Sequence, residues 1–262
     1  MNRALRTAAT GMLAQQMNVD LISHNLANVN TTGFKKSRAE FQDLMYQTIK
    51  ASATSSDGQT QEATEIQIGN GTMPAAVVKS FSQGDVQPTN NPLDLAIQGE
   101  GFIQIRRPDG TIAYTRDGSL KISGEGQLVT SQGDIVEPGI SVGTDTASIT
   151  IAKDGTIEAT TVGQTTPTKI GQLELAKFVN PGGLKAIGNN LLVETPASGK
   201  PILGTAGAEG FGDLTEGSLE ASNVDVVEEM ISMIVAQRAY EINSKTVKTV
   251  EDMLAMANNL QR

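Results

Sequence analysis

The residue types that most often carry chemistry in proteins are scarce in this sequence. His24 is the single histidine, and the chain has no cysteine. A Ser-His-Asp or Cys-His site would have to be built on His24, and the familiar zinc sites need several Cys or His ligands. Because His24 falls inside a predicted helix and off its apolar stripe, we interpret it as an ordinary polar residue. We therefore expect no catalytic residue, no metal ligand and no cofactor.

The carboxylates are numerous but show no metal-binding spacing. The Asp-Gly pairs, such as Asp109-Gly110 and Asp154-Gly155, stand singly among the 29 acidic residues. Without the Asp-x-Asp-x-Asp-Gly run of a calcium loop, these pairs are typical of hairpin turns. One enzymatic alternative remains, a carbohydrate-active enzyme that holds two carboxylates across a groove. Nothing in the spacing singles out such a pair.

Charge and composition exclude several classes of partner. The formal net charge is −9, which disfavours nucleic acid because duplex binding depends on Lys and Arg. Anionic membrane surfaces are disfavoured for the same reason. Gln15, Gln16 and Asn18 interrupt the first apolar run, so we expect no Sec-type signal peptide. The absence of cysteine suits export into an oxidising space without disulfides.

The two ends of the chain have the apolar spacing of long helices. At the N-terminal end, apolar residues recur every seven positions: Leu5, Met12, Val19 and Leu26, with Ala8, Ile22 and Val29 on the same stripe. At the C-terminal end five heptads follow one another: Val226, Met233, Tyr240, Val247 and Leu254, accompanied by Met230, Ala236, Val250 and Ala257. Ser222 or Asn223 is the expected N-cap. A helix over residues 224–260 would be about 55 Å long, and we expect it to pack along a partner.

Between these helices the apolar period changes to two, as in Ile103/Ile105 and Ile149/Ile151, which predicts antiparallel strands. The expected fold is α+β, with N- and C-terminal α-helices that form a coiled-coil-like pair and a central, mostly antiparallel β domain. The expected parts are a helical part over 1–45, an extended arm or linker over 46–75, a β domain over 76–221 and a C-terminal helix over 222–262. Within the arm, Gln47 to Glu65 is rich in Ser, Thr, Ala and Gln and has no clear period.

Two amphipathic ends leave two interpretations open. The helices could close a bundle private to one molecule, or their stripes could be interfaces that neighbouring subunits complete. Apolar surface of that size usually marks an interaction site, and contacts that do not close into a ring propagate as a helical polymer.

Several motifs resemble flagellar rod and hook proteins. The segment Ser23 to Lys35 resembles their N-terminal signature, with His24 where Asn is usual. The C-terminal segments 222–225 and 237–245 resemble the same family, as do 96–102 and 114–119 in the centre. Within the family, chain length and the segment from Phe41 to Gly69 resemble the distal rod subunits most. The proximal rod subunits are the alternative.

The resemblance implies a structural subunit, not an enzyme, that self-assembles into a rigid helical tube and transmits torque from motor to hook. The implied partners are further copies of the chain, proximal rod proteins, the hook protein, the peptidoglycan-layer and outer-membrane rings, the rod cap and the flagellar type III export apparatus. The implied location is the basal body, from the periplasmic space to the outer membrane, after export without a cleaved signal peptide.

The expected assembly interface comprises the heptad residues of both helices together with polar residues that fix register. We expect Asn25, Asn28 and Asn30 to form hydrogen bonds near the end of the first helix. Four residues are expected to set the register of the last helix: Gln237, Arg238, Tyr240 and Asn243.

Overall fold

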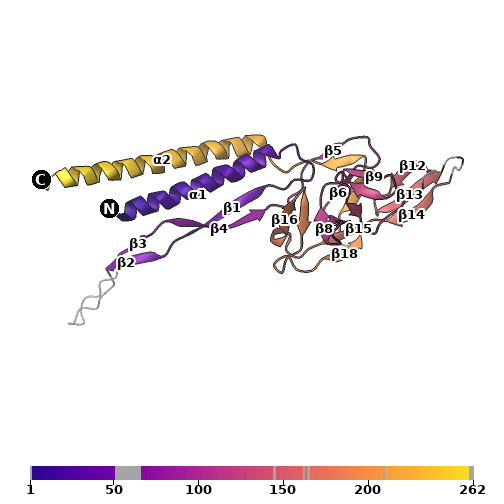
Figure 1. The fold of residues 1–262 in the computed structure, drawn as a ribbon, viewed down its shortest axis with the longest axis horizontal. Coiled ribbons are helices and arrows are strands. Elements are labelled where there is room, and N and C mark those ends of the chain that lie inside the picture. The colour runs from indigo at the N-terminus through magenta and orange to yellow at the C-terminus, as the bar shows by residue number, and fades with distance from the viewer. Residues whose placement is uncertain are drawn as a thin grey trace. The chain divides into compact units, whose positions relative to one another are not determined.

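The computed structural model describes residues 2–50, 66–143, 146–161, 163, 166–208 and 210–259. The chain divides into two compact units. Unit 1 consists of Met1–Leu26, Ser37–Val78 and Val226–Arg262, and unit 2 of Ala27–Lys36 and Lys79–Asp225. The α+β class expected from the sequence is confirmed, with one helix near each end and strands between them (Figure 1).

Unit 1 is built from two helices and four strands: α1 (Asn2–Ala27), β1 (Ser37–Asp43), β2 (Tyr46–Lys50), β3 (Ile66–Gly69), β4 (Thr72–Lys79) and α2 (Val226–Asn259). β1 pairs with β4, and β2 pairs antiparallel with β3. We call these four strands the ribbon. Where it is described, the segment 46–75 expected as an arm comprises β2, β3 and the start of β4. Residues 51–65 lie outside the described residues.

The helix ends differ in two details from those expected. α1 ends at Ala27, so Val29 lies in the following turn and does not extend the stripe. The expected N-cap was wrong, because α2 begins only at Val226. The side chain of Asn223 is occupied elsewhere: it donates to the carbonyl of Ser80 at 2.9 Å and accepts from the backbone N–H of Lys36 at 2.8 Å.

Unit 2 is a β unit whose described strand pairs are all antiparallel. Its largest sheet has nine strands, with the path β16-β17-β8-β7-β11-β10-β9 and with β15 and β18 attached beside β7. The strands of this sheet are β7 (Phe102–Arg106), β8 (Ile112–Thr115), β9 (Leu120–Ile122), β10 (Leu128–Thr130), β11 (Ile135–Val136), β15 (Glu174–Lys177), β16 (Lys185–Gly188), β17 (Leu191–Val193) and β18 (Ile202–Thr205).

Smaller sheets complete unit 2. They contain β12 (Thr146–Ile151), β13 (Thr156–Thr161) and β14 (Thr168–Gln172) in one sheet, the pair β6 (Leu95–Gln98) and β19 (Asp213–Glu216), and the pair β5 (Val86–Pro88) and β20 (Ser218–Glu220). A short 3₁₀ helix spans Pro181–Gly183.

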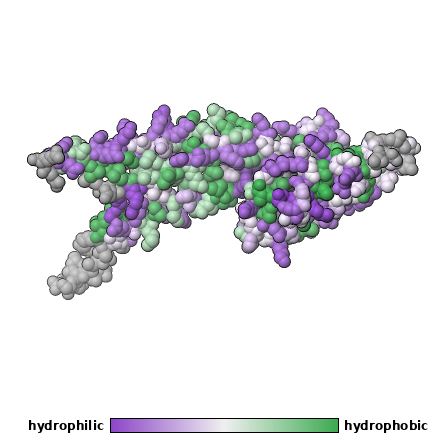
Figure 2. Space-filling view, in the orientation of Figure 1, coloured by the Kyte–Doolittle hydropathy of each residue, from purple (hydrophilic) through white to green (hydrophobic). Residues whose placement is uncertain are grey.

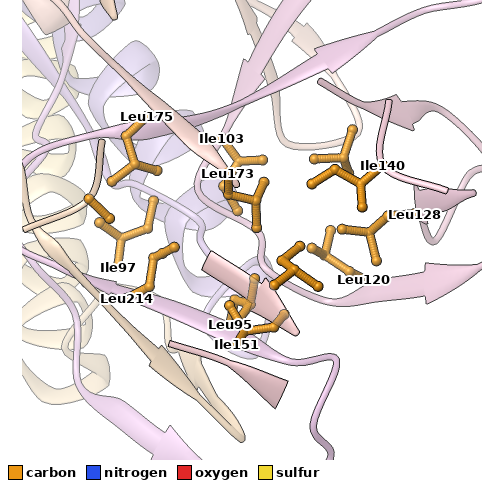
Figure 3. Close-up of a cluster of buried hydrophobic side chains, with 13 residues drawn as sticks. Leu95, Ile97, Ile103, Leu120, Leu128, Ile140, Ile151, Leu173, Leu175 and Leu214 are labelled. Carbon is orange, nitrogen blue, oxygen red and sulfur yellow. The ribbon is translucent and has the colours of Figure 1, made fainter. Parts of the chain in front are cut away.

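The core of unit 2 is mainly aliphatic, as the composition requires with 3% aromatic residues. Leu95, Ile103, Leu173 and Leu175 are essentially inaccessible within one cluster (Figure 3). A second cluster contains the rings of Phe102, Tyr114 and Phe178, which pack edge to face. Because the adjacent residues Phe102 and Ile103 of β7 enter different clusters, this strand is buried on both faces.

The Asp-Gly turns expected from the sequence include the one between β12 and β13. The carboxylate of Asp154 accepts from the backbone N–H of Thr156 at 3.0 Å and from its hydroxyl at 2.9 Å. These two hydrogen bonds hold the pKa of Asp154 below its ordinary value of 3.8, the backbone bond being the stronger cause. Both bonds favour the ionised carboxylate.

We expect Thr156→Val to raise the pKa of Asp154 toward 3.8 without restoring it fully, because the backbone bond remains. A carboxylate with a lowered folded-state pKa stabilises the fold above its unfolded pKa and loses that contribution as the pH falls through the folded value. Thr156→Val should therefore reduce the part of the folding stability that is lost as the pH falls below 3.8. NMR titration of the side-chain carboxyl measures the shift. Asp109, bonded in the same way to Thr111, is the internal control and should not move.

Candidate assembly interface

A buried group of charged side chains joins distant segments inside unit 2. We call Lys35, Arg116 and Glu220 the inner clamp. The Nζ of Lys35 lies 2.6 Å from Oε1 of Glu220, and Nη1 of Arg116 lies 3.1 Å from its Oε2. The three side chains are at most 5% exposed. The segment that follows α1 is thus tied to β20, which precedes α2 in the chain.

Further hydrogen bonds give most polar atoms of the inner clamp a partner. Lys35 also donates to the carbonyl of Ser82 at 2.7 Å, and Arg116 donates to the carbonyl of Gly99 at 2.5 Å. The backbone N–H of Gly84 donates to Oε1 of Glu220 at 3.0 Å. Burial lowers the pKa of Lys35, and the hydrogen bond and charge of Glu220 offset part of that effect. Within the described part of the chain, Nε of Arg116 is buried and has no hydrogen-bond partner.

The signature segment lies beside the inner clamp because of one glycine. Gly33 has φ +66°, and a Cβ there would lie 2.6 Å from the backbone nitrogen of Asp117. Its own N–H donates to the carbonyl of Glu220 at 2.8 Å. Only a residue without a side chain fits this approach. The glycine of the signature therefore has a structural role in unit 2.

In unit 1 the two helices run antiparallel. The amide of Asn25, near the end of α1, donates to Oε2 of Glu229 at 3.3 Å, near the start of α2. Farther along, a Cβ on Gly11 would lie 3.0 Å from the amide nitrogen of Asn243. Asn25 also bonds the backbone of Ser37 in both directions at 2.9 Å. This buried amide joins α1, α2 and the start of β1.

The ribbon is bonded to α1 at several points. Arg3 donates to Gln47 at 2.6 Å, and Arg6 donates to Asn70 at 2.8 Å. The hydroxyl of Thr10 accepts from the backbone N–H of Thr72 at 3.4 Å. These three contacts lie along the first half of α1, and Ser37 at the start of β1 bonds Asn25 near the end of the helix, so the ribbon follows most of α1. Neither described helix combines the length and the apolar content that a membrane span requires.

The heptad residues of α1 are only half-buried in the single chain. Leu5, Met12, Val19 and Leu26 are all of intermediate exposure, whereas Ala8, Ala14 and Ile22 are buried. Asn28 accepts a hydrogen bond from Thr31 at 3.2 Å, and Asn30 is exposed. The α1 stripe is thus incompletely covered by the chain's own α2 and ribbon.

The C-terminal heptad residues separate into two groups. Met233, Asn243, Val247 and Leu254 are of intermediate exposure, and Ala236 and Val250 are buried. Val226, Met230 and Tyr240 are 40%, 53% and 42% exposed. Arg238 forms an exposed ion pair with Glu241 at 2.9 Å. Gln237 and Tyr240 line a shallow groove with Gln16 and Val19.

A second apolar face of α2 was not predicted from the sequence. We call it the ridge; its members are Val227, Ile231, Ile234, Val235 and Ile242, which are 57–66% exposed. Figure 2 shows hydrophobic surface over the first half of α2. The heptad pattern selected the inward stripe together with the exposed Val226, Met230 and Tyr240, but none of the ridge residues. The run of apolar residues from Met230 to Ala236, interrupted only by Ser232, was the signal that could have revealed the ridge.

Comparison with known protein families covers most of the chain. Residues 5–35 match the description "Flagella basal body rod protein". Residues 96–159 match "Flagellar hook protein FlgE/F/G D1 domain", and residues 215–260 match "Flagellar basal body rod FlgEFG protein C-terminal".

Several known proteins are similar to this chain over its whole length. The flagellar basal-body rod protein FlgG of Borreliella burgdorferi is 53% identical, with 100% of both chains covered. FlgG of Caulobacter vibrioides is 49% identical over 99% of both chains, and FlgG of Bacillus subtilis 39% over 100% of both. The chain belongs to the family of flagellar basal-body rod proteins.

Proposed function

We propose that this protein is the structural subunit of the distal part of the flagellar rod, where it self-assembles into a rigid helical tube that transmits torque from motor to hook. It acts without catalysis, because torque transmission needs many simultaneous rigid contacts and no reaction. The relatives named as rod proteins, similar over the full chain, support this assignment.

One observation supports self-assembly most directly. The first half of α2 is apolar on its inward face and on the ridge, and the ridge is exposed in the single chain. Exposed apolar surface that is contiguous along a helix usually marks a protein interface. In the proposed tube, residues 1–45 and 222–262 form the helical core, residues 46–75 reach between subunits, and residues 76–221 form the outer part.

The proposed partners follow from the position in the basal body. They are the proximal rod proteins below, the hook protein above, the peptidoglycan-layer and outer-membrane rings around the tube, and the rod cap during growth. The subunits reach the tip through the flagellar type III export apparatus, for which a cysteine-free chain is suited.

Immunogold labelling of isolated hook-basal bodies with antibody against this chain tests the location. We expect label immediately below the hook. Label confined to the inner-membrane end would make the chain a proximal rod subunit, and unlabelled but accessible rods would contradict a structural role in the rod.

A further inference from the structure

In the described part of unit 2, β6 has β19 as its only strand partner. The pairs run from Asp213 with Gln98 to Glu216 with Leu95. Leu95 and Ile97 of β6 are at most 1% exposed. Because buried backbone N–H and C=O groups are nearly always hydrogen-bonded, the burial of β6 requires that β19 has already paired with it.

β19 also bonds the end of β12. The N–H of Leu214 donates to the carbonyl of Lys153 at 3.1 Å, and the N–H of Ile151 donates to Oε2 of Glu216 at 3.2 Å. Ile151 belongs to the three-stranded sheet and shares the aliphatic cluster with Ile103 of the nine-stranded sheet. Leu214, 1% exposed, lies in the same cluster (Figure 3). β19 therefore joins β6 to the core that both larger sheets share.

Close backbone packing fixes both ends of β19. A Cβ on Gly99 would lie 2.9 Å from Cα of Gly212, and the N–H of Gly212 donates to the carbonyl of Glu100 at 2.8 Å. After the strand, the N–H of Gly217 donates to the carbonyl of Asp94 at 2.8 Å. We call residues 211–217 the closing segment. It is held along its whole length by segments that precede it by many residues.

The closing segment comes late in the chain, since 210 of the 262 residues precede it. The nine-stranded and three-stranded sheets are built entirely from residues 102–205. Without the closing segment, however, β6 has no strand partner and the shared core has no cover from Leu214. Contacts between residues far apart in the sequence cost chain entropy before they stabilise the fold. The early sheets have to bear that cost with an incomplete core.

We infer that docking of the closing segment is the step that closes unit 2, so that neither larger sheet becomes stably protected until residues 211–217 have paired with β6. A chain that leaves a ribosome or a narrow export channel with its N-terminus first then keeps unit 2 open until the closing segment is also free. The inference concerns the folding of one chain and does not depend on the proposed assembly.

Pulsed hydrogen exchange during refolding of the full chain tests this order. The protein is unfolded in denaturant, diluted to start refolding, pulsed with deuterium at increasing times and analysed by mass spectrometry of its peptides. We expect peptides from β7, β13 and β15 to become protected with the same rate constant as those from β6 and β19. Protection of β7, β13 and β15 ahead of β19 would overturn the inference, because the larger sheets would then be stable without the closing segment.

Leu214→Ala gives a second measurement on the full chain. Loss of this buried side chain should slow the protection of β7, β13 and β15 roughly tenfold, and by the same factor as that of β19. The matched control is Leu203→Ala on β18, the same change at a side chain that is 51% exposed. It should alter these rates by no more than about twofold. If Leu214→Ala slows β19 alone, or slows nothing, the closing segment docks onto a unit that is already folded and the inference is wrong.

Discussion

Replacing Glu220 by glutamine should lower the free energy of unfolding of unit 2 by about 3–5 kcal/mol, the usual cost of removing one partner from a buried ion pair. The side chain of Glu220 is 0% exposed and is the shared counter-ion of Lys35 and Arg116. Glutamine has nearly the same shape but no charge, so two buried cations would keep their desolvation cost without compensation.

The loss should be concentrated where the inner clamp joins segments. Amide hydrogen exchange, resolved by peptide, should accelerate most in 28–36, 80–84 and 218–223, which Lys35 and Glu220 hold together. Denaturation followed by circular dichroism measures the overall free energy. If the inner clamp only filled space in the core, Glu220→Gln would leave the exchange rates of these three segments unchanged.

Glu241→Gln is the matched control. It removes the same charge from an ion pair whose partners are 74% and 64% exposed, and such pairs contribute about 0–1 kcal/mol. Equal destabilisation by the two substitutions would mean that burial is not what makes Glu220 important.

The inner clamp also shows a limit of reasoning from sequence. Glu220 is 185 residues from Lys35 and 104 residues from Arg116 in the sequence, and nothing local distinguishes the three from surface charges. Charged residues are almost never fully buried unless paired, and the pairing exists only after the chain has folded. The apolar periodicity of the sequence depends on residues close together in the chain, so it could not reveal this buried ion-pair group.

Features that local patterns determine were predicted well. The two terminal helices and the antiparallel strands follow from apolar periods of 3.5 and 2 that extend over several turns or strands. β1 was missed because Ser37–Asp43 is exposed over most of its length and has no apolar alternation. The N-cap was misplaced because Asn223 satisfies loop backbone groups instead of the first turn of α2.

For the candidate site, heptad counting located the inward stripe but mixed it with exposed residues. Met233 is half-buried, whereas its neighbour Ile234 is 57% exposed. A charge at Met233 would therefore disturb the packing within the chain as well as between chains. A substitution at the exposed Ile234 should disturb only the packing between chains.

Ile234→Asp should abolish polymer formation and motility while leaving the single chain folded. Substitutions at exposed positions usually change the free energy of unfolding by less than about 0.5 kcal/mol. In the assembly, by contrast, burial of an isoleucine is worth about 1.5–3 kcal/mol, and a buried unpaired carboxylate adds a further penalty. A loss of about 3 kcal/mol per contact weakens it more than a hundredfold, and every subunit of the polymer would carry that loss.

Sedimentation of purified protein measures assembly, and swimming of cells that express the variant as the only copy measures function. Ile234→Met, which keeps an apolar side chain and a good helix former, should retain both. Met233→Asp should lose assembly together with thermal stability, because its side chain already packs inside the chain. If Ile234→Asp forms normal rods, the ridge stays exposed in the polymer and the apolar face of α2 has another purpose.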